Sequence, residues 1–191
     1  MNLTAANAKP ASVVSLADLK SQLSQVQTDI ATAVSSLNAV KESAENEAAL
    51  TKAAAEYDRC YGMLQTRVDT LRTNAVTIKA TVKTTYEAWQ KELTAMQSAA
   101  LREKAQARFS ESQKEFEKII AKANEAKEKV LPFVSELKDI NIFLAADLSD
   151  EAVKSLSNTI WKLGNSSKSV IGSIDEVKQQ IDRTIKALPQ K

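Results

Sequence analysis

The sequence predicts an all-α protein: an elongated antiparallel bundle or coiled coil of three long helices plus a shorter N-terminal helix, in an up-down four-helix arrangement. Three glycines and three prolines in 191 residues leave few helix breaks. Ala, Lys, Glu, Gln, Leu and Ser dominate, as in long helices and coiled coils. Apolar residues also recur at alternating steps of three and four along four stretches, which is the repeat of helices packed as coiled coils.

The first two helices follow from these apolar stretches, which we term seams. We expect the first helix over residues 15–44, with Ser15 as a possible N-cap. Residues 1–14 are small and polar, and we expect them to be disordered. The apolar pattern changes phase after residue 44, so the chain must turn there before a second helix over residues 48–96. That seam carries Thr85 in its one polar position.

The last two helices are expected over residues 100–146 and 149–188. Ser149 is a good N-cap, and the acidic residues Asp150 and Glu151 that follow it favour the positive end of a helix dipole. Pro189 ends the fourth helix. All four helices belong to one predicted domain, residues 15–189. Their short connections place neighbouring helices antiparallel.

The charge pattern argues against several classes of function. The 26 basic and 24 acidic residues give a net charge of +2 and are interleaved along the helices. Nucleic-acid binding needs a basic stripe to neutralise phosphates, so we expect none. No stretch approaches the roughly 20 apolar residues of a membrane span. Binding to a membrane surface stays open but is not favoured, since it needs a concentrated basic face or an amphipathic segment.

Catalytic chemistry is also hard to assemble from this composition. The chain has no histidine, which is the commonest general base and metal ligand. Its single cysteine, Cys60, lies at the edge of a seam in mid-helix, where thiols are usually inert. The three glycines stand apart, so no phosphate-binding loop is available. We therefore expect a non-enzymatic protein with no cofactor and no metal.

A bend with an aromatic layer is predicted where the third helix carries a proline. Pro132 removes a backbone hydrogen bond and bends the helix. Residues equidistant from a turn lie at one level of an antiparallel bundle, and this operation places glycines and aromatic rings beside Pro132. The layer is a candidate for a pocket or for simple gap filling. Its members are Tyr57, Tyr61, Gly62, Pro132, Phe133, Asp139, Trp161 and Gly164.

The same operation predicts a polar layer at another level. Thr85, Ser112 and Thr184 interrupt three different seams at nearly one height. Small polar residues in such seams can fix the register of the helices at a cost in stability. The alternative is three unrelated, tolerated hydroxyls.

Several landmarks resemble a bacterial family of unknown function, domain family 2959. They are YD at residues 57–58, YEAWQKEL at 86–93, SAALR at 98–102, LPFVSELKDINIFL at 131–144 and EAVKSL at 151–156. The resemblance covers most of the chain from about Leu50. It implies long helical proteins, often lipoprotein-like or carrying export signals, with no assigned activity. The chain departs from the family where AADLSD follows residues 143–144, so no anion-binding role is carried over to that turn.

These observations favour a structural or protein-interaction bundle of the bacterial cell envelope or periplasm, with cytoplasm as the alternative location. We expect a protein partner or self-association, with the ends of the long helices beyond the first helix as the contact. A membrane-surface or lipid-associating protein is one alternative. The other is a carrier of small apolar ligands that uses the aromatic layer around Pro132.

Overall fold

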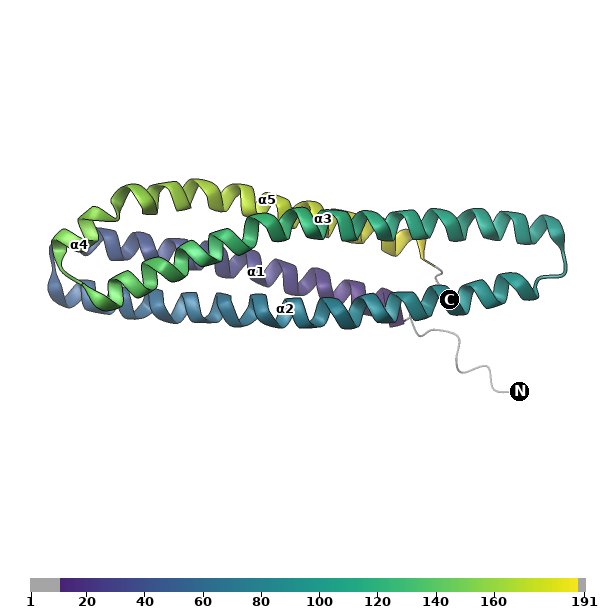
Figure 1. Ribbon diagram of the computed structural model, residues 1–191, viewed down its shortest axis with the longest axis horizontal. Coiled ribbons are helices and arrows are strands. Elements are labelled where there is room, and N and C mark those ends of the chain that lie inside the picture. Colours follow the sequence, from purple (N-terminus) through teal and green to yellow (C-terminus); the bar gives the residue numbers. More distant parts are fainter. Residues whose placement is uncertain (1–10, 189–191) are drawn as a thin grey trace.

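The computed structural model describes residues 11–188 and confirms the all-α fold (Figure 1). This part of the chain forms α1 Ala11–Glu42, α2 Glu47–Ala95, α3 Ala99–Ala146, α4 Asp150–Ser155 and α5 Ser157–Ala187. Side-chain caps define three helix starts. Asn46 accepts a hydrogen bond from the Ala49 N–H, Ser98 caps α3, and Ser149 caps α4 as expected.

Two of the expected boundaries were wrong. The first helix begins at Ala11 rather than at Ser15, so residues 11–14 are helical instead of disordered. The rest of the segment expected to be disordered, residues 1–10, lies outside the described residues. The expected fourth helix is also interrupted: α4 ends at Ser155, and α5 starts after Leu156. Neither Gly nor Pro stands at this break, so the sequence carried no simple signal for it.

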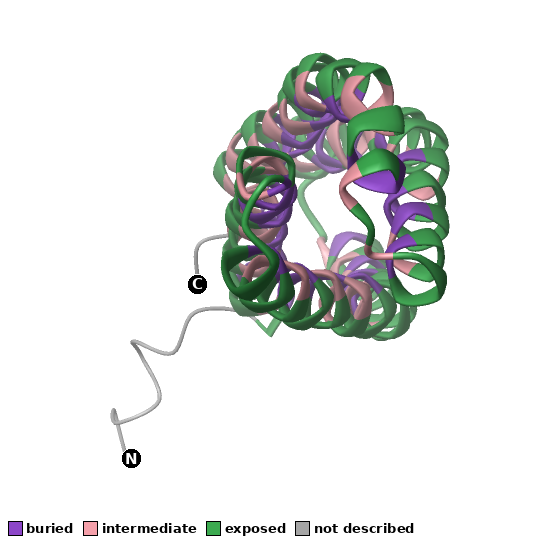
Figure 2. Cartoon of the chain, turned by 90° about the vertical axis from the view of Figure 1, so that its left-hand side faces the viewer, coloured by how far each residue is buried: buried purple, intermediate pink, exposed green. Residues whose placement is uncertain are grey.

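The four long helices form a ring in the order α1, α2, α3, α5, because α1 packs on α2 and α5, and α3 also packs on α2 and α5. Consecutive long helices run in opposite directions along the molecule, which confirms the up-down arrangement (Figure 1). The short helix α4 lies at the end where α3 connects to α5. An end-on view shows buried residues on the inward side of the ring (Figure 2).

The core consists of the predicted seams. Leu16, Ile30 and Leu37 of α1 are completely buried, as are Leu64 of α2 and Leu137 of α3. Full burial of one such side chain contributes about 1.5–3 kcal/mol. Sustained spacing of three and four was therefore enough to identify which side of each helix faces inward.

Pro132 lies inside α3, and this helix changes direction partway along its length (Figure 1). Proline has no N–H to donate and its ring crowds the preceding turn, so bends within helices commonly occur at this residue. The bend carries α3 from the side of α5 toward the side of α2 at the far end of the bundle (Figure 1). A bend in the helix that carries this proline was the expectation, and Figure 1 shows that α3 bends.

The helices α2 and α3 extend well beyond α1 and α5 within the described chain (Figure 1). Asn74 on α2 donates to Gln22 on α1 at 3.0 Å, so Ala11, eleven positions before Gln22, lies near the level of residue 85. At the other side, Thr184 donates to the Glu115 carbonyl at 3.0 Å, which places the end of α5 near residue 112. We call residues 86–112 the arm.

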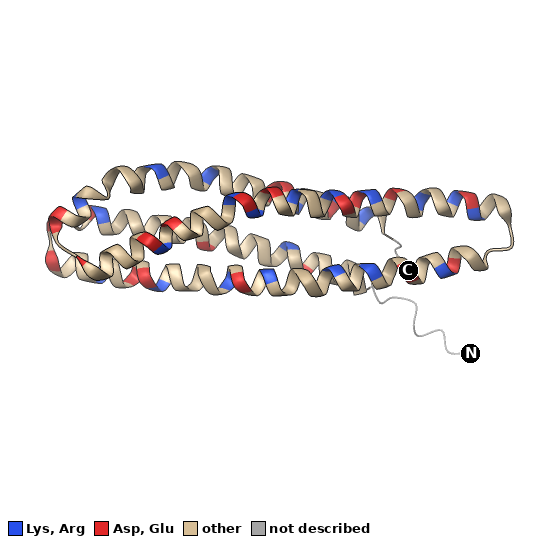
Figure 3. Cartoon of the chain, in the orientation of Figure 1, with Lys and Arg blue, Asp and Glu red and all other residues tan. Residues whose placement is uncertain are grey.

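Charges of both signs are interleaved over the length of the molecule (Figure 3). Along residues 11–188, no helix combines the length and the apolar character needed to cross a membrane.

Candidate functional site

The base of the arm is held together by four aromatic rings. Tyr86 and Trp89 come from α2, and Phe109 and Phe116 come from α3. Phe109 meets the Tyr86 ring edge-on at a centroid distance of 5.7 Å and the Trp89 ring at 5.3 Å. Edge-to-face pairs of this kind contribute about 0.5–1.5 kcal/mol each beyond their buried area. The cluster therefore joins the two helices at the level where α1 and α5 end.

A buried hydrogen bond lies in the same place. The Tyr86 hydroxyl donates to the Ser112 carbonyl oxygen at 2.7 Å and lies 3.0 Å from the Ser112 hydroxyl. Both residues are buried. Burial raises the pKa of Tyr86 above its ordinary value, although the Ser112 hydroxyl opposes this rise. The phenol is therefore a stable donor at neutral pH, which links α2 to α3.

The end of α5 is tied to the same part of α3. The Gln180 amide donates to the Glu115 carboxylate at 2.7 Å and to the Glu115 backbone carbonyl at 3.1 Å. Lys118 also pairs with the Glu115 carboxylate. The hydrogen bond from Lys118, followed by the one from Gln180, lowers the pKa of Glu115. These contacts, with that of Thr184, fix where α5 stops along α3.

The expected polar layer is thus present only in part. Ser112 and Thr184 do lie close to one level, since Thr184 bonds to Glu115, less than one helical turn from Ser112. Thr85 adjoins Tyr86 and so also lies near this level, but it is only half-buried, and its hydroxyl donates to the Thr81 carbonyl within α2 at 3.1 Å. Tyr86 takes its place, and sequence reasoning missed both Tyr86 and Gln180. Spacing alone could have found Tyr86, because it is four residues after Val82 and three before Trp89.

The outer part of the arm presents apolar side chains that are only partly covered. Trp89, Met96 and Ala105 are half-buried, and Leu101 is 62% exposed. Near the turn, a shallow hollow is lined by Met96, Leu101 and Ala105 together with Lys104 and Arg108. The outer part of α2 and α3 therefore leaves several apolar side chains accessible.

The layer expected around Pro132 contains one interior contact between helices. Tyr57 is completely buried, and its hydroxyl donates to the Leu137 carbonyl of α3 at 2.7 Å. Asp139, expected in the same layer, is exposed. Phe133 is buried, while Tyr61 is half-buried and donates to Gln65 on its own helix at 3.3 Å. Burial raises the pKa of Tyr57 far above its ordinary range.

The glycines and Trp161 do not join this layer. Pro132 and Gly62 are exposed, and Trp161 is 65% exposed. A Cβ added at Gly62 or Gly164 would meet no atom within 4 Å, so neither glycine allows a close approach of another helix. The expectation that two glycines face Pro132 was therefore wrong, because Gly62 and Pro132 are exposed and no other helix lies close to Gly164.

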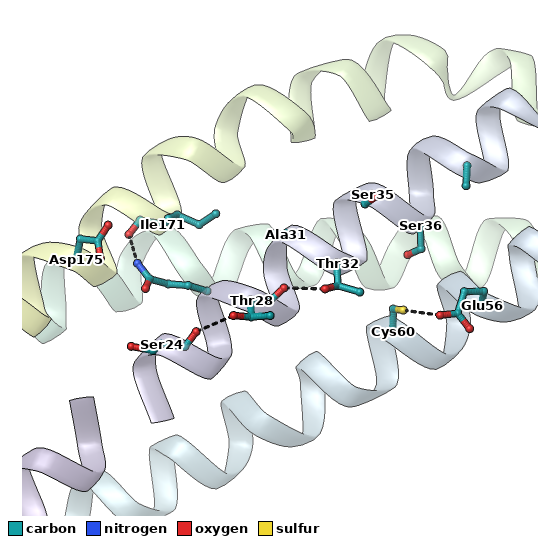
Figure 4. Close-up of a pocket in the computed structure, with 12 residues that line it drawn as sticks. Ser24, Thr28, Ala31, Thr32, Ser35, Ser36, Glu56, Cys60, Ile171 and Asp175 are labelled. Atoms are coloured by element: carbon teal, nitrogen blue, oxygen red, sulfur yellow. Dashed lines mark hydrogen bonds between the residues drawn. The ribbon is translucent and has the colours of Figure 1, made fainter. Parts of the chain in front are cut away.

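Cys60 is buried beneath a shallow groove that runs along α1 (Figure 4). Its thiol donates to the Glu56 carboxylate at 3.4 Å. Burial raises the pKa of Cys60, and the Glu56 carboxylate adds to the rise. A thiol is a poor nucleophile when it stays protonated. Burial and the neighbouring carboxylate both favour the protonated, unreactive form of this thiol.

The groove beside Cys60 looks polar but has few free donors (Figure 4). Thr28 donates to the Ser24 carbonyl at 3.2 Å, and Thr32 donates to the Thr28 carbonyl at 2.9 Å. Ser36 donates to the Ala33 carbonyl at 2.9 Å. Hydroxyls that bond back to their own helix are occupied, so the groove offers little to a polar ligand.

The comparison with protein families gives one match over nearly the whole chain. Residues 7–188 match the model of a family described as protein of unknown function, DUF2959. No curated protein and no solved structure is significantly similar to the chain. The family resemblance expected from the sequence landmarks is therefore confirmed, and the chain belongs to the DUF2959 family.

Proposed function

We propose that this protein is a non-enzymatic helical structural protein that forms assemblies through its arm, with the arm of a second copy as the partner. The observation that carries the proposal is the length of α2 and α3 compared with α1 and α5. Over most of the bundle, the seams of α2 and α3 are covered by those two shorter helices. In the arm, the described chain provides no such cover.

A second arm supplies what the first one lacks. Two arms packed side by side bring four helices together, as in the adjoining bundle, and cover Trp89, Met96 and Ala105. Apolar groups at such contacts gain about 25 cal/mol per Å² removed from water. Pairing of identical surfaces about a two-fold axis is the commonest way for soluble proteins to associate.

The charges of the arm are compatible with pairing. Glu87 lies 3.8 Å from Lys83, which comes just before the arm, and Lys104 and Arg108 share their helix with Glu103 and Glu111. Charges of both signs are also interleaved along this part of the molecule in Figure 3. Two copies therefore meet without a concentration of like charge, which would otherwise oppose association.

Sedimentation equilibrium tests the proposal with two variants. Leu101→Glu and Trp89→Glu each put a carboxylate into the proposed contact, and burying an unpaired charge is costly. We expect the unaltered protein to be a dimer at micromolar concentration and both variants to shift toward monomer. The matched control is Trp161→Glu, since Trp161 is 65% exposed but lies on α5, away from the arm.

Two results would count against arm pairing. One is an unaltered protein that stays monomeric at the highest concentration tested. The other is a Trp161→Glu variant that dissociates as readily as the Leu101→Glu variant, because the contact would then lie elsewhere. Circular dichroism of each variant verifies that the helices are retained.

We further propose that the protein works in the bacterial cell envelope. The support is the resemblance of the sequence landmarks to long helical proteins that are often lipoprotein-like. Fractionation of cells that produce the native protein tests this location. Recovery in the periplasmic or membrane-associated fraction supports it, and recovery with cytoplasmic markers contradicts it.

A further inference from the structure

An apolar cleft opens into the bundle between α2 and α3, on the bundle side of the arm. Its volume is about 460 Å³, within the 300–1,000 Å³ range of sites for small molecules. Leu19 and Leu23 of α1 and Ile174 of α5 form its floor. The walls come from residues 68–79 of α2 and residues 116–131 of α3. All four long helices therefore contribute to this cleft.

The cleft exists because small residues stand where α2 and α3 face each other. Ala75 follows Leu71 by four positions on α2, and Ala123 follows Ile119 by four on α3, so both continue the seams of their helices. Both are nevertheless exposed and line the cleft. Leu71 and Val130, also seam positions, are only half-buried. A seam position that is not buried shows that the two helices separate here. The interior is thus reachable from outside over this length.

The charged residues that line the cleft are all basic. They are Arg72 and Lys79 on α2 and Lys127 on α3, and no Asp or Glu among residues 11–188 lines it. Arg72 has a long contact with Asp69, at 3.7 Å. Lys79 and Lys127 make no ion pair within 4 Å in the described part of the chain. Three cations, two of them unpaired, thus surround an apolar interior.

We propose that the α2–α3 cleft binds a single-chain anionic amphiphile, a long-chain fatty acid. Its acyl chain lies against Leu19, Leu23 and Ile174, and its carboxylate is held by the cations at the opening. The apolar floor suits the acyl chain of the fatty acid, and the unpaired lysines suit its carboxylate head group. This site is separate from the arm and differs from the aromatic layer around Pro132.

Direct binding measurements with the full-length protein test the site. The probe is a fatty acid with a fluorescent group, displaced by unlabelled palmitate below its critical micelle concentration. We expect saturable binding of one probe per chain and displacement by palmitate. The uncharged alcohol of the same chain length should bind more weakly, by up to about fivefold, since an exposed ion pair contributes up to about 1 kcal/mol.

Two pairs of variants locate the binding. Ala123→Phe fills the cleft from its α3 wall, and Ala121→Phe makes the same change at an exposed residue two positions away that does not line the cleft. Lys79→Glu with Lys127→Glu reverses the charge at the opening, and Lys114→Glu is the control outside it. We expect Ala123→Phe to raise the dissociation constant at least about tenfold and the lysine double variant at least about fivefold, while both controls bind normally.

Three results would overturn the proposal. The first is a lack of saturable fatty-acid binding by the unaltered protein, including the case in which it binds only vesicles of anionic phospholipid. The second is equal binding by Ala123→Phe and Ala121→Phe with circular dichroism unchanged. The third is equal affinity for the acid and the alcohol. Arm pairing is measured separately by sedimentation, so either proposal can fail without the other.

Discussion

Removal of one buried hydroxyl tests how α2 and α3 are joined. Tyr57 is completely buried and donates to the Leu137 carbonyl at 2.7 Å. The substitution Tyr57→Phe keeps the ring, and with it the packing, but deletes the donor. A typical intramolecular hydrogen bond contributes about 0.5–1.5 kcal/mol net. We therefore expect the free energy of unfolding to fall by about 1 kcal/mol, with a decrease in melting temperature of about 2–4 °C.

Urea denaturation followed by circular dichroism measures this change, and Tyr61→Phe is its matched control. Tyr61 is one helical turn away, but it is half-buried and its hydroxyl bonds only to Gln65 of its own helix at 3.3 Å. Loss of that hydroxyl should lower the free energy of unfolding by less than about 0.5 kcal/mol. Equal losses for the two variants would refute the assignment of the Tyr57 contact. A second control, Asp139→Asn, should leave stability unchanged because Asp139 is exposed.

The same residue makes stability depend on alkaline pH. Burial raises the pKa of Tyr57 above the ordinary tyrosine value of about 10. Because the folded state holds this proton more tightly than the unfolded state, the contribution is complete below pH 10 and is lost as the pH rises further. The unaltered protein should therefore lose stability above pH 10 more steeply than Tyr57→Phe. Parallel pH profiles would contradict this reasoning.

Three further outcomes are expected. Gly62→Ala and Gly164→Ala should each stabilise the protein by about 0.5–1 kcal/mol in urea denaturation, because both glycines are helical with open space around a Cβ; a destabilised variant would show that these positions need glycine. Cys60 should react with a thiol reagent far more slowly in the folded protein than in urea, because the thiol is buried and burial raises its pKa; equal rates would show it to be accessible. Phe109→Ala should lower the free energy of unfolding by about 3 kcal/mol, because it removes the ring that contacts both Tyr86 and Trp89. It should also shift Trp89 fluorescence to longer wavelength. An unchanged spectrum would place Trp89 outside the cluster.

The fold was largely predictable because burial in a helical bundle follows a simple repeat. Steps of three and four keep side chains on one side of a helix. Residues such as Leu37, Leu64, Ile160 and Ile181 therefore pointed inward as expected. The break at Leu156 was not predictable in this way, since it lies between two helices without Gly or Pro and its Leu residue is compatible with a helix.

The aromatic layer around Pro132 shows the limits of pairing residues that are equidistant from a turn. This pairing predicts the level of a residue along the bundle but not the side of the helix on which it lies. Its levels were correct: Tyr57 meets Leu137, and Tyr86 meets Ser112. The level of a residue along the bundle does not determine whether its side chain points inward, however. Gly62 and Trp161 fall between seam positions, so they point outward even though their height was right. Checking each residue against the seam of its own helix would have removed both.

Thr85 has the predicted level but is only half-buried, and the neighbouring Tyr86 is buried instead. Both Thr85 and Tyr86 satisfy a spacing of three or four from Val82 and from Trp89. A tyrosine ring gains more from burial than a threonine side chain, and its hydroxyl can still reach an acceptor on a neighbouring helix. The α2–α3 cleft was less accessible to sequence reasoning. Ala75 and Ala123 fit an ordinary seam, and only the arrangement of the helices shows that they leave room.

The most direct test of arm pairing is a distance measurement between two copies by pulsed electron paramagnetic resonance. In a Cys60→Ser background, Lys91→Cys places one spin label on the arm, and Glu45→Cys places one at the opposite end, where Glu45 is 86% exposed. The account predicts a defined distance below about 50 Å between Lys91 labels. For arms that overlap with the two bundles pointing away from each other, it predicts no such distance between Glu45 labels, because about 65 Å of α2 separates residues 47 and 91 in each copy at 1.5 Å per residue. No dipolar coupling at Lys91, or a short distance at Glu45, would contradict it.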